Sequence, residues 1–345
     1  IKYFSYSSRK YDYYSLTVVY NLYRINSRDD FDVVLKFSNN RLLHWGFISL
    51  ISYIVFILAL MKFDIFFYFF NGGLLRYTPL RRLELQILKL AGAKIIAMPY
   101  GADVVVPSRI RELYGHKKWN LSKFIYINYP NINEEENRKN IEYTTKYADF
   151  IMTTCGPIPS SLPRYDLILT NIIPIDTRHW RPKIKTNNKK IRIVHASNHR
   201  AIKGTEYVIK VCEDLKKEGY PIELVIVEKM ENKKAKKIYE TADIIVDQLI
   251  GGWYGLFAIE GMALGKPVIC YLYDELKEKV DYAKELPLVS ANPDNLKEVL
   301  IKLIKNKKLR VELGKRSREF VEKYHSERFI GKILDEIYKK VWFGG

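Results

Sequence analysis

Short apolar runs alternate with helical segments along the whole of this 345-residue chain, and this alternation limits the folds open to it. The pattern is typical of parallel α/β units, in which each strand is followed by a helix that crosses back over the sheet. A domain takes roughly 150 residues, so the length predicts two such units. We therefore expect an α/β protein with two doubly wound domains.

The expected elements fall into two sets. In the first half, strands are predicted at 2–6, 32–37, 64–70, 94–98, 150–153 and 167–170, with helices around 13–24, 42–61, 80–91 and 134–147. In the second half, strands are predicted at 191–196, 222–227, 244–246, 267–271 and 286–289, with helices at 205–218, 234–241, 256–264 and 295–305. A helical tail is expected from 308 to about 342, with a break near His325.

The boundary between the domains is expected near residues 174–190. Pro174, Pro182 and the polar run Lys185–Lys190 have the composition of a linker. The chain then divides into residues 1–182, residues 183–325 and a helix over 326–345 that could pack back on the first domain. Two open α/β domains that face each other leave a cleft at the carboxyl ends of their strands, where such sheets bind ligands.

Charge and cysteine content narrow the partners and the compartment. The formal net charge of +18 fits a lysine-rich surface, an anionic membrane surface or polyanionic substrates. Nucleic acid is disfavoured as a partner, because no helix-turn-helix, RNP or zinc-finger pattern occurs. Cys155, Cys212 and Cys270 are far apart in the chain, which argues against a disulfide framework and favours a reducing, cytoplasmic compartment.

One helical segment has three possible interpretations. Residues 42–61 carry no charge over 20 positions, which meets the length of a membrane span. Ser49 and Ser52 interrupt the run, however, and Asp64 follows it at once. A helix packed inside the first domain is therefore favoured over a helix that docks one face onto a bilayer, and both are favoured over a true span.

The most informative segment is 243–269, where a buried strand ends at Asp247 and a glycine-rich turn leads into a helix. Glycines allow backbone N–H groups to approach a phosphate closely, and the positive end of a helix dipole favours an anion. Glu260 lies one turn into this helix, on the same face as Leu256 and Leu264. Burying an unpaired carboxylate costs several kcal/mol, so a role in binding hydroxyls is plausible.

This block, in its order and spacing, resembles the GT-B glycosyltransferases, and in particular the retaining family 4, the glycosyl transferases group 1. The resemblance implies two Rossmann-like doubly wound domains facing a cleft, the first binding an acceptor and the second a nucleotide sugar. Glu260 matches the family glutamate that holds the donor ribose, and the earlier motif glutamate falls on Gly252. The other donor-binding residues that the resemblance implies are Gly255, Leu256 and Phe257, with Asp247, Trp253 or Tyr254 as candidates to replace the missing glutamate.

Two further segments carry the resemblance. In 194–204, Lys203 matches the family's diphosphate-binding lysine, its arginine partner falls on Asn198, and Arg200 could supply the second positive charge. A diphosphate leaving group needs such cations, because charge grows on it as the glycosidic bond breaks. The alternative is a solvated Arg and Lys at a helix start. Segment 172–182 resembles the family's interdomain signature, within which Asp176 is expected to cap a turn.

Two glycine turns of the first domain are expected to open onto the cleft. Gly72 and Gly73 follow the third strand, and Tyr100 and Gly101 follow the fourth. Asp103, just beyond, either contacts sugar hydroxyls in a catalytic role or caps a helix. Further on, 109–124 interleaves basic and aromatic residues, which suits an anionic acceptor, a membrane headgroup layer or a solvated loop.

The sequence favours no metal and no cofactor apart from the nucleotide sugar. His195 and His199 straddle a strand end and do not share one helix face, and no Asp-x-Asp pair ends a strand. The function expected from the resemblance is sugar transfer, with retention, to a glycan or lipid-linked acceptor by a cytoplasmic enzyme that could be peripheral on the inner membrane face. A non-catalytic sugar-nucleotide-binding subunit and a GT-B-type sugar-nucleotide epimerase are the alternatives.

Overall fold

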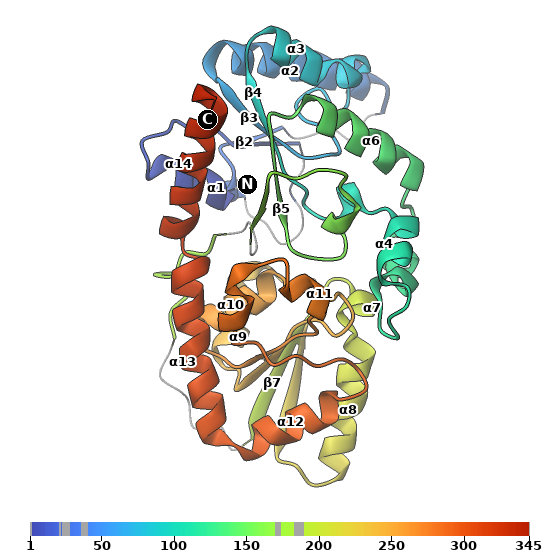
Figure 1. Ribbon diagram of the computed structural model, residues 1–345, viewed down its shortest axis with the longest axis vertical. Helices are drawn as coiled ribbons and strands as arrows, with labels where there is room; N and C mark the ends of the chain where they lie inside the picture. The colour runs from blue at the N-terminus through green and yellow to red at the C-terminus, as the bar shows by residue number, and fades with distance from the viewer. Residues whose placement is uncertain are drawn as a thin grey trace.

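Two parallel sheets with helices packed on both faces form the two lobes of the molecule (Figure 1). This computed structural model describes residues 2–20, 22, 28–35, 41–169, 174–182 and 190–344. The first sheet belongs to the N-terminal lobe and the second to the C-terminal lobe. The predicted fold class, α/β with two doubly wound domains, is confirmed.

In the described residues, the N-terminal sheet has the order β3-β4-β5-β6, and all of its pairs are parallel. Alternation along β4 sends Ile95 and Ala97 toward the core beneath α3 and α6, whereas Ile96 enters the core beneath α14. The elements of this lobe are α1 (Lys2–Arg9), β1 (Val18–Val19), β2 (Val33–Val34), α2 (Arg41–Lys62), β3 (Ile65–Tyr68), α3 (Glu84–Leu90), β4 (Lys94–Ala97), α4 (Pro107–Tyr114), α5 (Ile125–Asn128), α6 (Glu134–Tyr147), β5 (Phe150–Thr154) and β6 (Leu167–Leu169).

The C-terminal sheet has the order β10-β9-β7-β8, again parallel throughout its described strands. Its strands are rich in Ile and Val, as expected for a sheet that helices cover on both faces. The elements are β7 (Ile191–Ala196), α7 (Arg200–Lys203), α8 (Thr205–Lys217), β8 (Ile222–Val227), α9 (Asn232–Glu240), β9 (Ile244–Val246), α10 (Leu256–Ala263), β10 (Val268–Ile269), α11 (Asp274–Lys277), α12 (Leu296–Lys305) and α13 (Lys307–Tyr324).

The chain ends by crossing back to the N-terminal lobe (Figure 1). After α13, Ser326 caps α14 (Glu327–Phe343) by accepting a hydrogen bond from the Phe329 amide at 3.2 Å. Ile330 and Leu334 of α14 are fully buried against the N-terminal sheet. The helix also packs against α1, where the hydroxyls of Ser8 and Tyr338 lie 2.6 Å apart.

Two predictions near the N-terminus are wrong. Residues 2–6, predicted as a strand, belong to helix α1, and residues 18–19, predicted as helical, form β1 and pair with β2. α1 packs on α14, more than 300 residues later in the chain, and β1 lies beside a segment anchored by Asp32, which accepts from the Thr17 amide at 2.8 Å. These contacts join segments that are separated in the chain, so no local sequence pattern predicts them. They outweigh the weak local propensities for helix or strand.

Smaller differences occur elsewhere. β10 is limited to two residues, and Val289, predicted within a strand, forms only an isolated bridge to Ile269. Residues 170–173 and 183–189, which include the end of one predicted strand and most of the polar run 185–190, lie outside the described residues. So do residues 23–27 and 36–40, where a predicted helix and another predicted strand end. Asp176 accepts hydrogen bonds from the amides of Arg178 and His179, as the predicted turn cap requires.

The uncharged run 42–61 forms most of α2, and one face of this helix packs into the N-terminal lobe. Ser52 and Phe56 on that face are 0% and 4% exposed. Across the described residues, no helix is both long enough and apolar enough to cross a membrane. The prediction of a helix packed inside the first domain therefore holds for one face of α2, whereas its opposite face is exposed.

Candidate functional site

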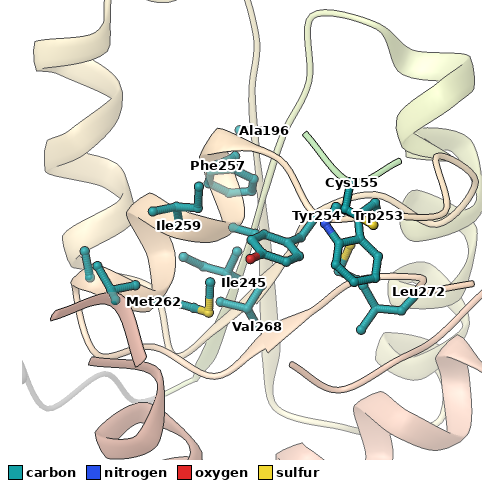
Figure 2. Close-up of a cluster of buried hydrophobic side chains, with 14 of the residues drawn as sticks. Cys155, Ala196, Ile245, Trp253, Tyr254, Phe257, Ile259, Met262, Val268 and Leu272 are labelled. Atoms are coloured by element: carbon teal, nitrogen blue, oxygen red, sulfur yellow. The ribbon is translucent and has the colours of Figure 1, made fainter. Parts of the chain in front are cut away.

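The two lobes meet in a shared apolar core on the side of the C-terminal lobe where its strands end. This core joins Val105, Ile110 and Tyr114 of the N-terminal lobe to aromatic side chains that follow β9. Figure 2 shows Trp253 and Tyr254 side by side in it, with Cys155 of the other lobe close by. The core fixes the position of the glycine-rich loop 251–255, which the sequence predicts to bind the donor.

Lys203, Asp247 and Gly255 come together at the carboxyl ends of β7 and β9. The Lys203 ammonium forms an ion pair with Oδ1 of Asp247, whose side chain is fully buried while that of Lys203 remains 18% exposed. Oδ2 of Asp247 accepts a hydrogen bond from the Gly255 amide at 3.0 Å, at the start of α10. One buried carboxylate thus places a cation beside a helix N-terminus, two groups that each favour an anion.

Glu260 lies on α10 close to this group. It is 5% exposed, and Nδ2 of Asn232 donates to its Oε1 at 3.0 Å. Burial raises the pKa of Glu260 to about 7, since the Asn232 hydrogen bond and the Lys203 charge only partly offset desolvation and the charge of Asp247. Glu260 is therefore poised to change its protonation state near neutral pH.

His195 supports the site from within the C-terminal lobe. Its Nδ1 lies 2.8 Å from the Val246 carbonyl, and its Nε2 lies 2.9 Å from the Thr205 hydroxyl. Because a carbonyl only accepts, we assign the ring proton to Nδ1, which leaves Nε2 to accept from Thr205. Burial lowers the pKa of His195 to about 4, so the ring is neutral and ties β7, β9 and α8 together.

Arg200 and Asn198 are engaged elsewhere in this structure. The Arg200 guanidinium pairs with Glu228 and Glu206, both at 2.7 Å, and its side chain is 41% exposed. Asn198 is exposed, and its side-chain oxygen accepts from the Lys229 amide at 3.4 Å. A second cation at the diphosphate requires Arg200 to exchange these carboxylates for phosphate, so that role stays a prediction.

The structure gives a reason for the glycine in place of the motif glutamate. Gly252 has φ +75°, and a Cβ there would lie 2.7 Å from the Tyr273 ring, so no side chain fits. Trp253 and Tyr254, proposed as replacements, are 2% and 3% exposed in the interlobe core. Of the three candidate replacements, only Asp247 lies beside Lys203.

Asp103 is buried between two loops of the N-terminal lobe. The residue is 2% exposed; its Oδ1 accepts from the amides of Tyr100 and Gly101, and its Oδ2 accepts from the Phe70 amide at 3.2 Å. It neither caps a helix nor reaches the surface, because the carboxylate joins the loops that follow β3 and β4. Burial raises the pKa of Asp103 to about 6 despite these bonds. In this structure the carboxylate supports the two loops, and its catalytic role stays a prediction.

The two glycine turns lie side by side at this edge of the N-terminal lobe. Tyr100 is 56% exposed, and its hydroxyl accepts a hydrogen bond from Nδ2 of Asn71 at 2.7 Å. Gly72 and Gly101 have φ of +108° and +131°, and a Cβ at Gly73 would overlap the Tyr68 hydroxyl. Both turns therefore need glycine, and they present a polar rim at the ends of β3 and β4.

The basic and aromatic stretch 109–124 is a bridge between the lobes. Lys117 pairs with Glu275 at 2.7 Å, and Lys118 pairs with Asp294 at 2.6 Å. Nε1 of Trp119 donates to the same Asp294 at 2.7 Å. Lys117 and Lys118 thus contact carboxylates of the C-terminal lobe, and a role of this stretch toward an acceptor or a headgroup layer stays a prediction.

Two residues that contribute to the site, Asn232 and Tyr273, belong to no sequence motif that would have identified them. Asn232 begins α9 and was not singled out, since an asparagine at a helix start is ordinarily a cap. Tyr273, which fills the space above Gly252, was also missed, because its hydroxyl donates to Trp119 and Ile250 carbonyls that are distant in sequence. Among the described residues, no three His, Cys, Asp or Glu side chains group closely enough to hold a metal ion.

Comparison with known proteins finds a family match in the C-terminal lobe. Residues 228–320 match the family model "Glycosyl transferases group 1", so the C-terminal lobe carries a domain of that type. This stretch contains Asp247, Gly255 and Glu260, whereas Lys203 precedes it.

An uncharacterized glycosyltransferase, MJ1178, from Methanocaldococcus jannaschii is 40% identical over 88 residues. That match spans 24% of this chain and 25% of the relative's length. Alr3699/HepE from Anabaena, solved in complex with UDP and glucose, has a similar fold with a TM-score of 0.58 and 10% identity, covering 90% of this chain and 87% of that one. A putative UDP-N-acetylglucosamine 2-epimerase from Listeria monocytogenes also has a similar fold, with a TM-score of 0.55 and 12% identity. That match covers 100% of this chain and 93% of the other. The fold is that of the GT-B glycosyltransferases.

Proposed function

We propose that this chain is a glycosyltransferase that moves a sugar from a nucleotide-activated donor to a glycan or lipid-linked acceptor, with retention of anomeric configuration. The observation that carries the proposal is the convergence of Lys203, Asp247 and Glu260 at the start of α10. A cation and a helix N-terminus suit a diphosphate, and a neighbouring carboxylate suits the vicinal hydroxyls of a ribose.

Each group has a distinct role in this proposal. Lys203 and the first amides of α10 stabilise the negative charge that grows on the departing diphosphate. Glu260, held by Asn232, accepts hydrogen bonds from the ribose, and the rim at Tyr100 and Gly101 receives the acceptor. We propose no metal or cofactor, because these groups themselves supply the positive charge, and EDTA is expected to leave turnover unchanged. HepE was solved with UDP, so uridine diphosphate sugars are the first donors to test.

Replacing Glu260 with glutamine is expected to weaken donor binding by roughly 10-fold or more, because hydrogen bonds to an ionised acceptor contribute about 1.5–3 kcal/mol. The measurement is calorimetric titration with UDP-sugars. Glu298→Gln, an exposed glutamate on α12, is the matched control and should bind as the parent does. An unchanged affinity in Glu260→Gln would remove this residue from the site.

Donor affinity is also expected to depend on pH. The pKa of Glu260 is raised to about 7, so the carboxyl is protonated below that pH and ionised above it. Affinity in the parent should therefore rise as pH increases from 6 to 8, and Glu260→Gln should abolish this part of the rise. A pH profile identical in parent and variant would assign the dependence to another group.

Two other functions remain testable in the same preparation. The missing motif carboxylate at Gly252 suits a non-catalytic subunit that only binds sugar nucleotides, and the Listeria neighbour suits an epimerase. Incubation with donor alone separates them from the proposal: an altered sugar nucleotide indicates epimerisation. Transfer that requires an added acceptor supports a transferase, and donor binding without any product indicates a binding subunit.

A further inference from the structure

α2 leaves a continuous apolar face uncovered. Its exposed side chains are Leu50, Ile54, Ile57, Leu58 and Met61, at 57%, 49%, 54%, 59% and 80% exposure. These positions are spaced by three and four residues, so they share one side of the helix. The buried Ser52 and Phe56 lie on the other side, and α2 therefore divides between the core of the lobe and the outside.

An uncovered face of this kind marks an interaction surface. Single exposed apolar side chains are ordinary on protein surfaces, whereas several large ones in a row along one helix are not. Figure 1 places α2 at the end of the N-terminal lobe that is remote from the C-terminal lobe. The face is thus separate from the candidate donor site, and a partner bound there would leave that site open.

The charges around this face indicate which partner it takes. None of the 22 residues of α2 is Asp or Glu, and the helix has Lys62 in its last turn. The Lys62 ammonium lies 4.6 Å from the centre of the Tyr14 ring, which is 65% exposed and stacks on Phe63. Aromatic rings and lysines at the edge of an apolar face are typical of side chains at a membrane–water boundary.

A second copy of the chain fits this face less well than a bilayer does. Each copy carries a formal charge of +18, so apposed copies repel, whereas anionic headgroups attract the same charge. The stretch 109–124 is a weaker candidate for membrane contact, because Lys117 and Lys118 are paired with the C-terminal lobe.

We propose that the exposed face of α2 inserts into the headgroup region of an anionic phospholipid bilayer, with the helix lying along the membrane surface. Its five apolar side chains enter the boundary with the acyl chains, and Lys62 and Tyr14 remain at the headgroups. This docking would hold the N-terminal lobe at the membrane. It stands independently of the proposed sugar transfer, and if both hold, membrane docking favours a lipid-linked acceptor over a free glycan.

The experiment is sedimentation of the full chain with vesicles of phosphatidylcholine, alone or with phosphatidylglycerol, at low and high salt. The parent is expected to bind the anionic vesicles, and high salt should weaken this binding without abolishing it, because the apolar contribution is not screened. Ile54→Asp/Leu58→Asp is expected to lower the partition coefficient by roughly 10-fold or more, since it removes two exposed apolar side chains that would enter the bilayer.

Val311→Asp is the matched control, because Val311 is 58% exposed on α13 of the other lobe and should keep vesicle binding. Thermal melting of all variants checks the fold. Failure of the parent to bind any vesicle, or equal binding by the α2 double variant, would overturn the proposal. So would a dimer in sedimentation equilibrium that the α2 variant dissociates, since the face would then belong to a second copy.

Discussion

Lys203→Ala is expected to lower turnover by roughly 10²-fold or more, the scale of losing one electrostatic contact to a transition state. Lys203 Nζ would lie 3.8 Å from a Cβ placed at Gly255, just before α10, and charge on the proposed diphosphate grows as the sugar leaves. Donor affinity should fall less than turnover, because the ground-state diphosphate is still held by the amides of α10. Single-turnover kinetics with calorimetry separate the two quantities.

The partner of Lys203 offers a sharper test. Alanine leaves Asp247 buried without its cation, beside the place proposed for the diphosphate, so part of the loss comes from repulsion. Lys203→Ala/Asp247→Asn should therefore recover part of the lost donor affinity. Lys210→Ala, on the exposed side of α8, is the matched control. A parental rate in Lys203→Ala would contradict the assignment.

Arg200→Ala tests the second cation. If Arg200 leaves Glu206 and Glu228 to bind the diphosphate, turnover should again fall by roughly 10²-fold. An intact rate would mean that Arg200 keeps the ion pairs seen here, facing away from the donor.

Sequence reasoning succeeded best in the C-terminal lobe, for a physical reason. Strands such as Ile222–Val227 and Ile244–Val246 are covered on both faces, so they appear as apolar runs bounded by polar turns. The helical tail also divides near His325, as predicted, because Ser326 is a strong N-cap. Near the N-terminus, α1 is stabilised by packing against α14 at the other end of the chain, and no local sequence pattern predicts that contact.

The candidate site was likewise predicted from the sequence only in part. Motif spacing places Lys203, Asp247 and Gly255 at strand ends, and parallel strands bring those ends to one edge. Motif spacing does not reveal which side chains already form hydrogen bonds or ion pairs with residues of other segments. The Phe70 amide bound to Asp103 and the Glu228 carboxylate beside Arg200 come from separate segments, so these contacts could be found only in the structure.

Gly252→Glu, which restores the motif carboxylate, is expected to destabilise the protein by roughly 2–5 kcal/mol and not to raise activity. A non-glycine residue in the left-handed region costs about 1–2 kcal/mol, and overpacking typically costs another 1–3. Gly252 has φ +75°, and its missing Cβ would meet the Tyr273 ring at 2.7 Å. That ring cannot easily move, because its hydroxyl donates to the carbonyls of Trp119 and Ile250. Urea denaturation of parent and variant measures the difference.

Gly255→Ala is the matched control for this prediction, since it adds a methyl group in the same loop without strain. Gly255 has an extended backbone, and a Cβ there would lie 3.8 Å from both Lys203 Nζ and Asp247 Oδ2, an ordinary contact. We expect its free energy of unfolding to stay within about 1 kcal/mol of the parent value. A Gly252→Glu variant as stable as the parent, with faster sugar transfer, would contradict this prediction and show that the Tyr273 ring can move aside. The carboxylate at position 252 would then fit the place where the resemblance expects a glutamate.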